Sequence, residues 1–230
     1  MSIFTASQME ESRAREEICR VGASLFDRCF VHATAGNISV RLADGYLITP
    51  TDACLGQLDP AQLSKLDANL QQISGSKASK TIALHASIYS AARQFDTETA
   101  CVIHTHSTFC VARSLATDGK QIELLPAITP YFVMKVGHVP HIPYHRPGDA
   151  AAAQAVADAI LRYGQAGTPL RAVMLARLGP NVWHDSPAQA MAVLEELEET
   201  AKLMHLSGKH IAPLSEPQIQ TLRDTFDARW

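Results

Sequence analysis

The sequence has few cysteines and no cluster of positive charge. Its five cysteines are odd in number, lie mostly in apolar surroundings and form no Cys-x-x-Cys pair, which favours buried reduced thiols over a disulfide framework. Lysine and arginine are scattered along a chain of formal net charge −3, so neither nucleic acid nor an anionic membrane surface is expected as a partner. A phosphate ligand would therefore have to be held by a small local group of residues.

Long apolar runs are absent too. No stretch approaches the roughly 18 consecutive apolar residues that span a bilayer, and the charges at Glu10, Glu11 and Arg13 are unlike a signal peptide. We therefore expect a cytoplasmic protein. Hydrophobic residues make up 47% of the chain, enough for a full core, and neither a repeat nor a long linker divides it. The sequence predicts a single domain over residues 1–230.

Local patterns predict an α/β protein in which short strands, several joined by hairpins, alternate with helices. The sheet should be largely antiparallel or mixed, with helices available for both of its faces. The expected helices include 7–28 with Ser7 at its cap, about 149–163 capped by Asp149, and 215–230, which should pack on the domain or at a subunit interface. The other expected elements are hairpins over 34–48 and 64–73, a strand over 121–125, an irregular segment over 126–147, and a strand over 172–176 turning at Gly179 and Pro180.

Residues 101–107 read Cys-Val-Ile-His-Thr-His-Ser, which is typical of a buried strand running into two histidines. Alternate side chains of a strand share a face, so His104 and His106 should project from one side, about 6–7 Å apart along the backbone. Two such imidazoles can bind one zinc-like ion, although an open catalytic site needs about three protein ligands. The alternative is a strand end with one packed and one hydrogen-bonded histidine.

Two loops are candidates for binding an anion. The first, Ala-Gly-Asn at 35–37, can present free backbone N–H groups, but is also typical of an ordinary turn. The second, Ser-Gly-Ser-Lys-Ala-Ser-Lys at 74–80, opens a helix, whose unpaired amides and dipole suit a phosphate. A solvated helix cap is the alternative explanation for this loop.

Together these segments resemble the class II aldolase/adducin family, from the first helix to the long helix that ends near Leu206. The resemblance is carried, in the family's order, by 34–41 (Thr-Ala-Gly-Asn-Ile-Ser-Val-Arg), 77–85 (Lys-Ala-Ser-Lys-Thr-Ile-Ala-Leu-His), 102–107 and 174–180 (Met-Leu-Ala-Arg-Leu-Gly-Pro). Segments 49–56, 134–137, 142–144 and 195–199 look closest to the family's 3-oxo-tetronate 4-phosphate decarboxylase branch.

The resemblance implies a three-layer αβα fold, a homotetramer with active sites between subunits, and a divalent metal, usually zinc. The implied function is that of a lyase acting on a small phosphorylated sugar acid or keto acid. Aldol cleavage and decarboxylation both pass through an enediolate that a metal can stabilise. The implied site residues are His104 and His106 for the metal, Gly36, Asn37, Ser79 and Lys80 for the phosphate, and Tyr131 as a candidate for proton transfer.

Two positions depart from the family pattern. Thr81 stands where the family has its catalytic glutamate, and Leu178 where it has a third metal histidine. Threonine is not a carboxylate base, and leucine binds no metal. Two interpretations therefore stay open: a rebuilt site with a ligand from His138, His141, His145 or His184, or a catalytically silent protein that serves in ligand binding or assembly.

Overall fold

A single eight-stranded sheet organises the chain in the computed structural model, which describes residues 10–117, 122–208 and 211–230. The strand order is β4-β3-β2-β1-β5-β8-β7-β6, and neighbouring strands are antiparallel except for the parallel pair β6 and β7. The largely antiparallel or mixed sheet is thus confirmed. The strands are β1 (Asn37–Arg41), β2 (Gly45–Ile48), β3 (Ser64–Asp67), β4 (Gln72–Ser74), β5 (Cys101–His104), β6 (His141–Ile142), β7 (Ala172–Leu175) and β8 (Gly179–His184).

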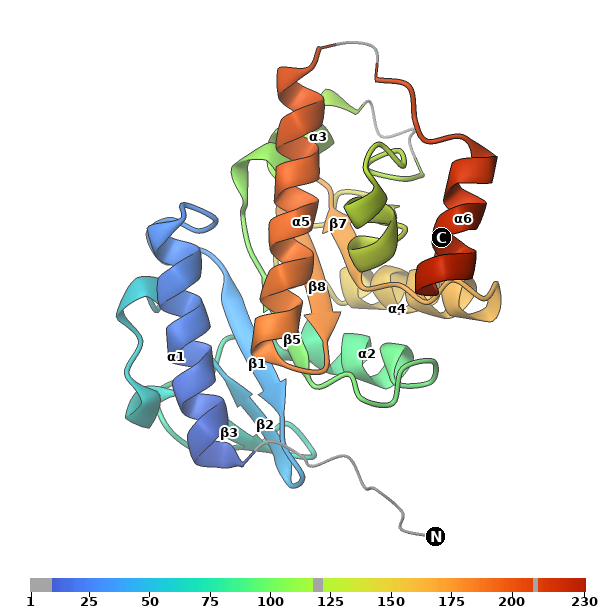
Figure 1. Ribbon diagram of the computed structural model, residues 1–230. Coiled ribbons are helices and arrows are strands. Elements are labelled where there is room, and N and C mark those ends of the chain that lie inside the picture. The colour runs from blue at the N-terminus through green and yellow to red at the C-terminus, as the bar shows by residue number, and fades with distance from the viewer. Residues whose placement is uncertain (1–9, 118–121, 209–210) are drawn as a thin grey trace, which may run out of the picture.

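Helices cover both faces of this sheet and make three layers, as Figure 1 shows. One face buries a core with α1, α3 and α5, and the other buries a second core with α2 and α4. The α-helices are α1 (Glu11–Asp27), α2 (Ile82–Ala92), α3 (Thr108–Ala116), α4 (Ala150–Gln165), α5 (Pro187–Leu206) and α6 (Glu216–Phe226). Shorter helical turns are η1 (Leu55–Gln57), η2 (Pro60–Gln62) and η3 (Phe132–Val136). The αβα class expected from the resemblance is confirmed.

Strand β5 lies at the centre of the sheet, between β1 and β8, and all four of its residues are buried. Its side chains alternate between the two cores, with Ile103 in the α1–α5 core and Val102 in the α2–α4 core. The register places His104 opposite Asn37 on one side and Asn181 on the other. A row of three buried polar residues therefore crosses the middle of the sheet.

Several predicted boundaries are wrong. Residues 122–125 form no strand, because Glu123 makes only an isolated bridge to Pro140; residue 121 lies outside the described residues. The segment 126–147 is not wholly irregular, since it contains η3 and β6. The first helix starts at Glu11 in the described part of the chain, and the predicted cap at Ser7 lies outside it.

Residues Gly179 and Pro180 differ most from the prediction. They begin strand β8 instead of forming a turn, and the turn occupies 176–178. Proline is tolerated near the start of a strand, where its missing N–H costs least. Here its carbonyl oxygen accepts from the Thr105 N–H at 3.3 Å, so Pro180 joins the ladder as an acceptor.

The C-terminal helix packs on its own chain. Ile219 of α6 joins a small cluster with Ala127 and Val133. The helix ends at Phe226, four residues before the predicted end at 230, and the chain then folds back so that Trp230 stacks on the His138 ring at 4.3 Å.

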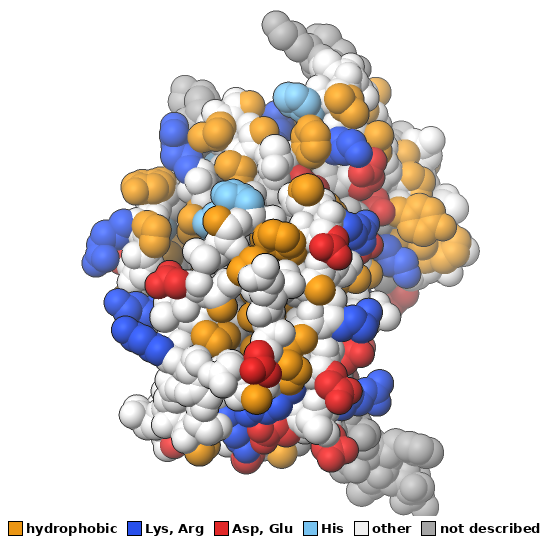
Figure 2. Space-filling view, turned by 90° about the vertical axis from the view of Figure 1, so that its left-hand side faces the viewer, with side chains coloured by type: hydrophobic (Ala, Val, Ile, Leu, Met, Phe, Trp, Pro, Cys, Tyr) orange, Lys and Arg blue, Asp and Glu red, His pale blue; other side chains and the backbone are white. Residues whose placement is uncertain are grey.

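The surface agrees with a chain of balanced charge, whereas the expectation of buried reduced thiols holds only in part. All five cysteines are free; Cys101 and Cys110 are buried, whereas Cys29 is exposed. On the face drawn in Figure 2, acidic and basic side chains are interspersed. Among the described residues, none of the helices combines the length and apolar character needed to cross a membrane.

Candidate active site

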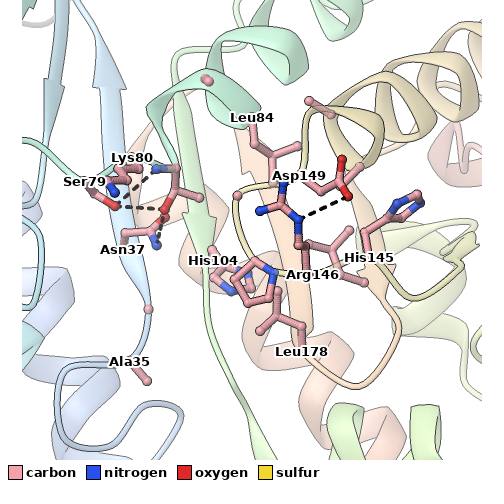
Figure 3. Close-up of a pocket in the computed structure, with 18 of the residues that line it drawn as sticks. Ala35, Asn37, Ser79, Lys80, Leu84, His104, His145, Arg146, Asp149 and Leu178 are labelled. Carbon is pink, nitrogen blue, oxygen red and sulfur yellow. Dashed lines mark hydrogen bonds and ion pairs between the residues drawn. The ribbon is translucent and has the colours of Figure 1, made fainter.

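A cavity of about 480 Å³ lies beyond the carboxyl end of β5. The start of β1, the loop into α2, and the loop between β6 and α4 supply its walls, together with the turn after β7. Figure 3 shows Asn37, Ser79 and Lys80 at one end, Arg146 and Asp149 at the other, and His104 between them. Segments that are far apart in the sequence thus meet around the histidine pair.

The end formed by β1 and α2 is a network of hydroxyl and amide groups. The Asn37 side-chain amide donates to Thr81 Oγ1 at 3.2 Å, and Thr81 Oγ1 lies 2.8 Å from Ser79 Oγ. Because Thr81 Oγ1 already accepts from Asn37 and the Thr81 N–H reaches Ser79 Oγ at 3.4 Å, the Thr81 hydroxyl is best placed to donate to Ser79. The Ser79 hydrogen is then available to an anion in the cavity.

Gly36 brings this candidate anion cradle (Gly36, Asn37, Ser79, Lys80 and Thr81) against the histidine strand. Its φ is +84°, and a Cβ there would lie 2.8 Å from Val31 Cγ1 and 2.9 Å from the carbonyl oxygen of His104. The position therefore requires glycine for both conformation and space. Lys80 is exposed at the cavity wall, at the start of α2, where a positive charge favours an anion.

The imidazole of His104 is held in one tautomer. Burial, with a smaller effect of His106, lowers its pKa to about 3, so the ring is neutral at neutral pH. Its Nδ1–H then donates to the carbonyl oxygen of Pro180 at 2.9 Å, which leaves the Nε2 lone pair unprotonated. A metal-binding histidine is commonly oriented in this way by a carbonyl oxygen behind it.

The spacing of the two imidazoles suits a shared ion. The ring centroids of His104 and His106 are 5.1 Å apart. Two imidazoles that bind one tetrahedral ion at about 2.0–2.1 Å place their centroids about 5 Å apart. Burial and the nearby His32 also lower the pKa of His106, which favours the neutral, ligating form. Within the described parts of this single chain, however, no three His, Cys, Asp or Glu side chains form a complete metal site.

Only one of the four histidines considered as a third ligand lines the cavity, and that residue is His145. The Nε2 atom of His141 lies 3.0 Å from Ser114 Oγ, and His138 stacks on Trp230. His184 contacts Asp185 at 3.1 Å. The cavity therefore leaves His145 as the candidate from within the chain.

The two departures from the family pattern both face this cavity. Thr81 belongs to the hydrogen-bonded cradle, and Leu178 joins Leu84 and Leu175 in an apolar part of the wall. Tyr131 is 62% exposed and is not among the described residues that line the cavity. Its role in proton transfer stays a prediction that would require a neighbouring subunit.

Sequence reasoning missed two charged residues of the cavity, Arg146 and Asp52. No motif surrounds either of them. Asp149 was expected only as a helix cap, which it is, since its Oδ1 accepts from the Ala151 N–H at 3.0 Å. It also lines the cavity, a role that its sequence context does not reveal.

The three-layer αβα fold, with Asn37, Ser79, His104 and His106 around one cavity, resembles that of class II aldolase-type proteins. Residues 16–205 match the family described as Class II Aldolase and Adducin N-terminal domain, and the chain belongs to this family. The family generally uses a divalent metal, often zinc.

Several known proteins are similar to this chain in sequence or fold. The 3-oxo-tetronate 4-phosphate decarboxylase of Cupriavidus necator is 50% identical over 226 residues, which cover 96% of this chain and 99% of that protein. The crystal structure of YgbL from Escherichia coli is 38% identical with a TM-score of 0.83, covering 93% of this chain and 99% of that one. A structure of L-fuculose 1-phosphate aldolase, 21% identical, shares the fold with a TM-score of 0.78 over 96% of this chain and all of the other.

Proposed function

We propose that the protein is a metal-dependent lyase that decarboxylates a phosphorylated keto acid of the 3-oxo-tetronate 4-phosphate type. The observation that carries the proposal is the hydrogen-bonded cradle of Asn37, Thr81 and Ser79 in the same cavity as the neutral His104 ring. The name of the Cupriavidus necator relative, which is half identical across nearly the whole chain, supports the same substrate.

Thr81 favours decarboxylation over aldol cleavage. Aldol cleavage must remove a proton from a hydroxyl group, a step for which a carboxylate base is suited. In a 3-oxo acid the carboxylate is already ionised: the bond from C1 to C2 breaks, carbon dioxide leaves, and the electron pair forms an enediolate with the C3 carbonyl. Protonation at C2 then gives dihydroxyacetone phosphate. The bond-breaking step therefore needs no base at position 81.

The proposal assigns phosphate binding, metal binding and the exclusion of water to different residues of the cavity. Gly36, Asn37, Ser79 and Lys80 bind the phosphate through backbone, amide, hydroxyl and ammonium groups. His104 and His106 would hold the divalent ion, expected to be zinc, which supplies positive charge next to the oxygen on which negative charge develops. The leucine side chains of the wall exclude water from the reacting carbons.

His145 is the residue of this chain proposed as third ligand. The proposal also includes a homotetramer in the cytoplasm, with cavities near subunit interfaces. In such an assembly the exposed Tyr131 would be available to a neighbouring cavity for proton transfer.

Turnover of 3-oxo-tetronate 4-phosphate by the zinc-loaded protein tests the function, with dihydroxyacetone phosphate measured by a coupled reductase. The double variant Thr81→Glu, Leu178→His distinguishes the proposal from a catalytically silent protein. We expect the native chain to turn over the substrate and the double variant to be no faster, because the bond-breaking step needs no carboxylate at position 81.

A silent family member gives the opposite pattern. The native chain would then be inactive with zinc, manganese or iron, and restoring the two family residues would create activity. That result would overturn the proposed function and leave ligand binding or assembly as the role of the fold.

A further inference from the structure

Arg146 stands at the opposite end of the cavity from the anion cradle. Figure 3 shows its guanidinium beside Asp149, with His104 between this pair and the group of Asn37, Ser79 and Lys80. Among the described residues that line the cavity, Lys80 and Arg146 are the lysine and arginine side chains. The cavity therefore has a cationic group at each end.

The Arg146 side chain is 74% exposed, and its contact with Asp149 is a loose one. Its Nε lies 3.9 Å from Asp149 Oδ2, an ion-pair distance that is too long for a hydrogen bond. Asp149 is itself fixed, because its other carboxylate oxygen accepts from the Ala151 N–H at the start of α4. Within the described residues, the guanidinium of Arg146 makes no closer polar contact, so the N–H groups of its two Nη atoms can meet a ligand.

The two cations suit different anions. Lysine presents a compact point charge, which fits the phosphate end, where hydroxyl and amide groups supply the directional contacts. Arginine presents a planar fork of N–H groups that matches both oxygens of a carboxylate. A ligand with phosphate at one end and carboxylate at the other matches the charges of this arrangement.

We propose that Arg146 binds the substrate's carboxylate and thereby selects phosphorylated keto acids over phosphorylated ketones and aldehydes. This inference rests on the proposed function. A fork that holds both carboxylate oxygens also fixes the plane of that group relative to the carbonyl, and therefore the direction of the bond that breaks. When carbon dioxide leaves, the charge that Arg146 binds disappears, so the product is released without this contact.

The test compares two unreactive ligands by calorimetry with the zinc-loaded protein. The first, 4-phosphoerythronate, carries carboxylate and phosphate and has a hydroxyl in place of the ketone; the second, glycerol 3-phosphate, lacks the carboxylate. In Arg146→Ala we expect the first to bind about 10- to 100-fold more weakly and the second to bind within about twofold of the native value. Arg146→Lys should recover part of the lost affinity, because it restores charge without the fork.

The matched control is Arg162→Ala, which removes an arginine from the far end of the same helix, α4. It should leave both affinities unchanged. Turnover should show the same selectivity, with a higher KM for the keto acid in Arg146→Ala and a smaller change in kcat.

Three outcomes overturn the inference, and they differ in what else they affect. If Arg146→Ala lowers the affinity for both ligands equally, or for neither, Arg146 does not bind the carboxylate. The proposed function is not affected by either result. If the native protein binds neither ligand, the proposed function falls as well.

Discussion

At the scale of single residues, His104 shows how neighbouring groups fix the protonation state and orientation of a side chain. The carbonyl oxygen of Pro180 fixes its Nδ1–H, and burial keeps the ring neutral. His85 on α2 is also buried, but it packs inside the protein. It is fully buried, its Nδ1 lies 2.8 Å from Ser39 Oγ, and it does not line the cavity. Its surroundings suit a packed histidine.

The metal content of purified protein checks the role of His104. We expect close to one equivalent of zinc, manganese or iron per native chain, and a loss of at least about tenfold in metal affinity in His104→Ala, because two imidazoles become one. His205→Ala removes an exposed imidazole at the end of α5 and should keep the metal. Native protein that stays metal-free in excess zinc would contradict the metal site.

At the scale of elements, Gly36 controls how the first hairpin meets the histidine strand. Gly36→Ala should lower the free energy of unfolding by about 2–4 kcal/mol and weaken phosphate binding, since it combines an unfavourable φ with a clash against β5. Gly167→Ala is the matched control, because Gly167 has φ +87° but no atom within 4 Å of an added Cβ. It should cost only about 1 kcal/mol.

Urea unfolding followed by circular dichroism measures both changes. The difference between the two variants isolates the clash from the backbone strain. Equal losses of stability, with phosphate binding intact in Gly36→Ala, would show that the close approach to His104 is unimportant.

The elements predicted well from sequence are those fixed by local signals. The hairpin of β1 and β2 follows from a turn between alternating residues, and α4 follows from Asp149, whose side chain caps it. Strand β8 was missed because Gly179 and Pro180 are typical of a turn. Its conformation is set by pairing with β5 and β7, which no local pattern records.

The cavity, like the fold, was only partly predictable from the sequence. His104, Asn37 and Ser79 were predicted from spacing and resemblance, and the structure places all three around one cavity, while their roles stay predictions. Arg146 was not found. A lone arginine in a loop carries no local signal, and only the path from β6 to α4 brings it opposite the cradle.

At the scale of the whole molecule, buried histidines make stability depend on pH. Burial, with a smaller effect of His104, lowers the pKa of His85 to about 3, and burial is also the main cause of the lowered pKa values of His141 and His184. The unfolded chain, with histidine pKa values near 6.5, binds more protons in this range. Stability is therefore fully present above about pH 6.5 and falls as the pH decreases toward 3.

Urea unfolding of chelator-treated protein between pH 7 and 5 measures this pH dependence of stability. We expect the free energy of unfolding to fall as the pH decreases, by at most about 1.4 kcal/mol per pH unit for each such histidine. His85→Gln should flatten the slope. A free energy of unfolding that is constant between pH 7 and 5 would show that these rings are not buried in their neutral forms.

The insertion of β8 between β5 and β7 has a consequence for the order of events during synthesis. Strands β1 to β5 come from the first half of the chain and can pair with one another before the rest emerges from the ribosome. Until β8 follows, β5 presents an open hydrogen-bonding edge, the kind of surface on which nascent chains aggregate or recruit chaperones. The carbonyl oxygen that orients His104 lies 76 residues downstream, so the His104 ring is fixed only late in synthesis, and the proposed metal would bind after that.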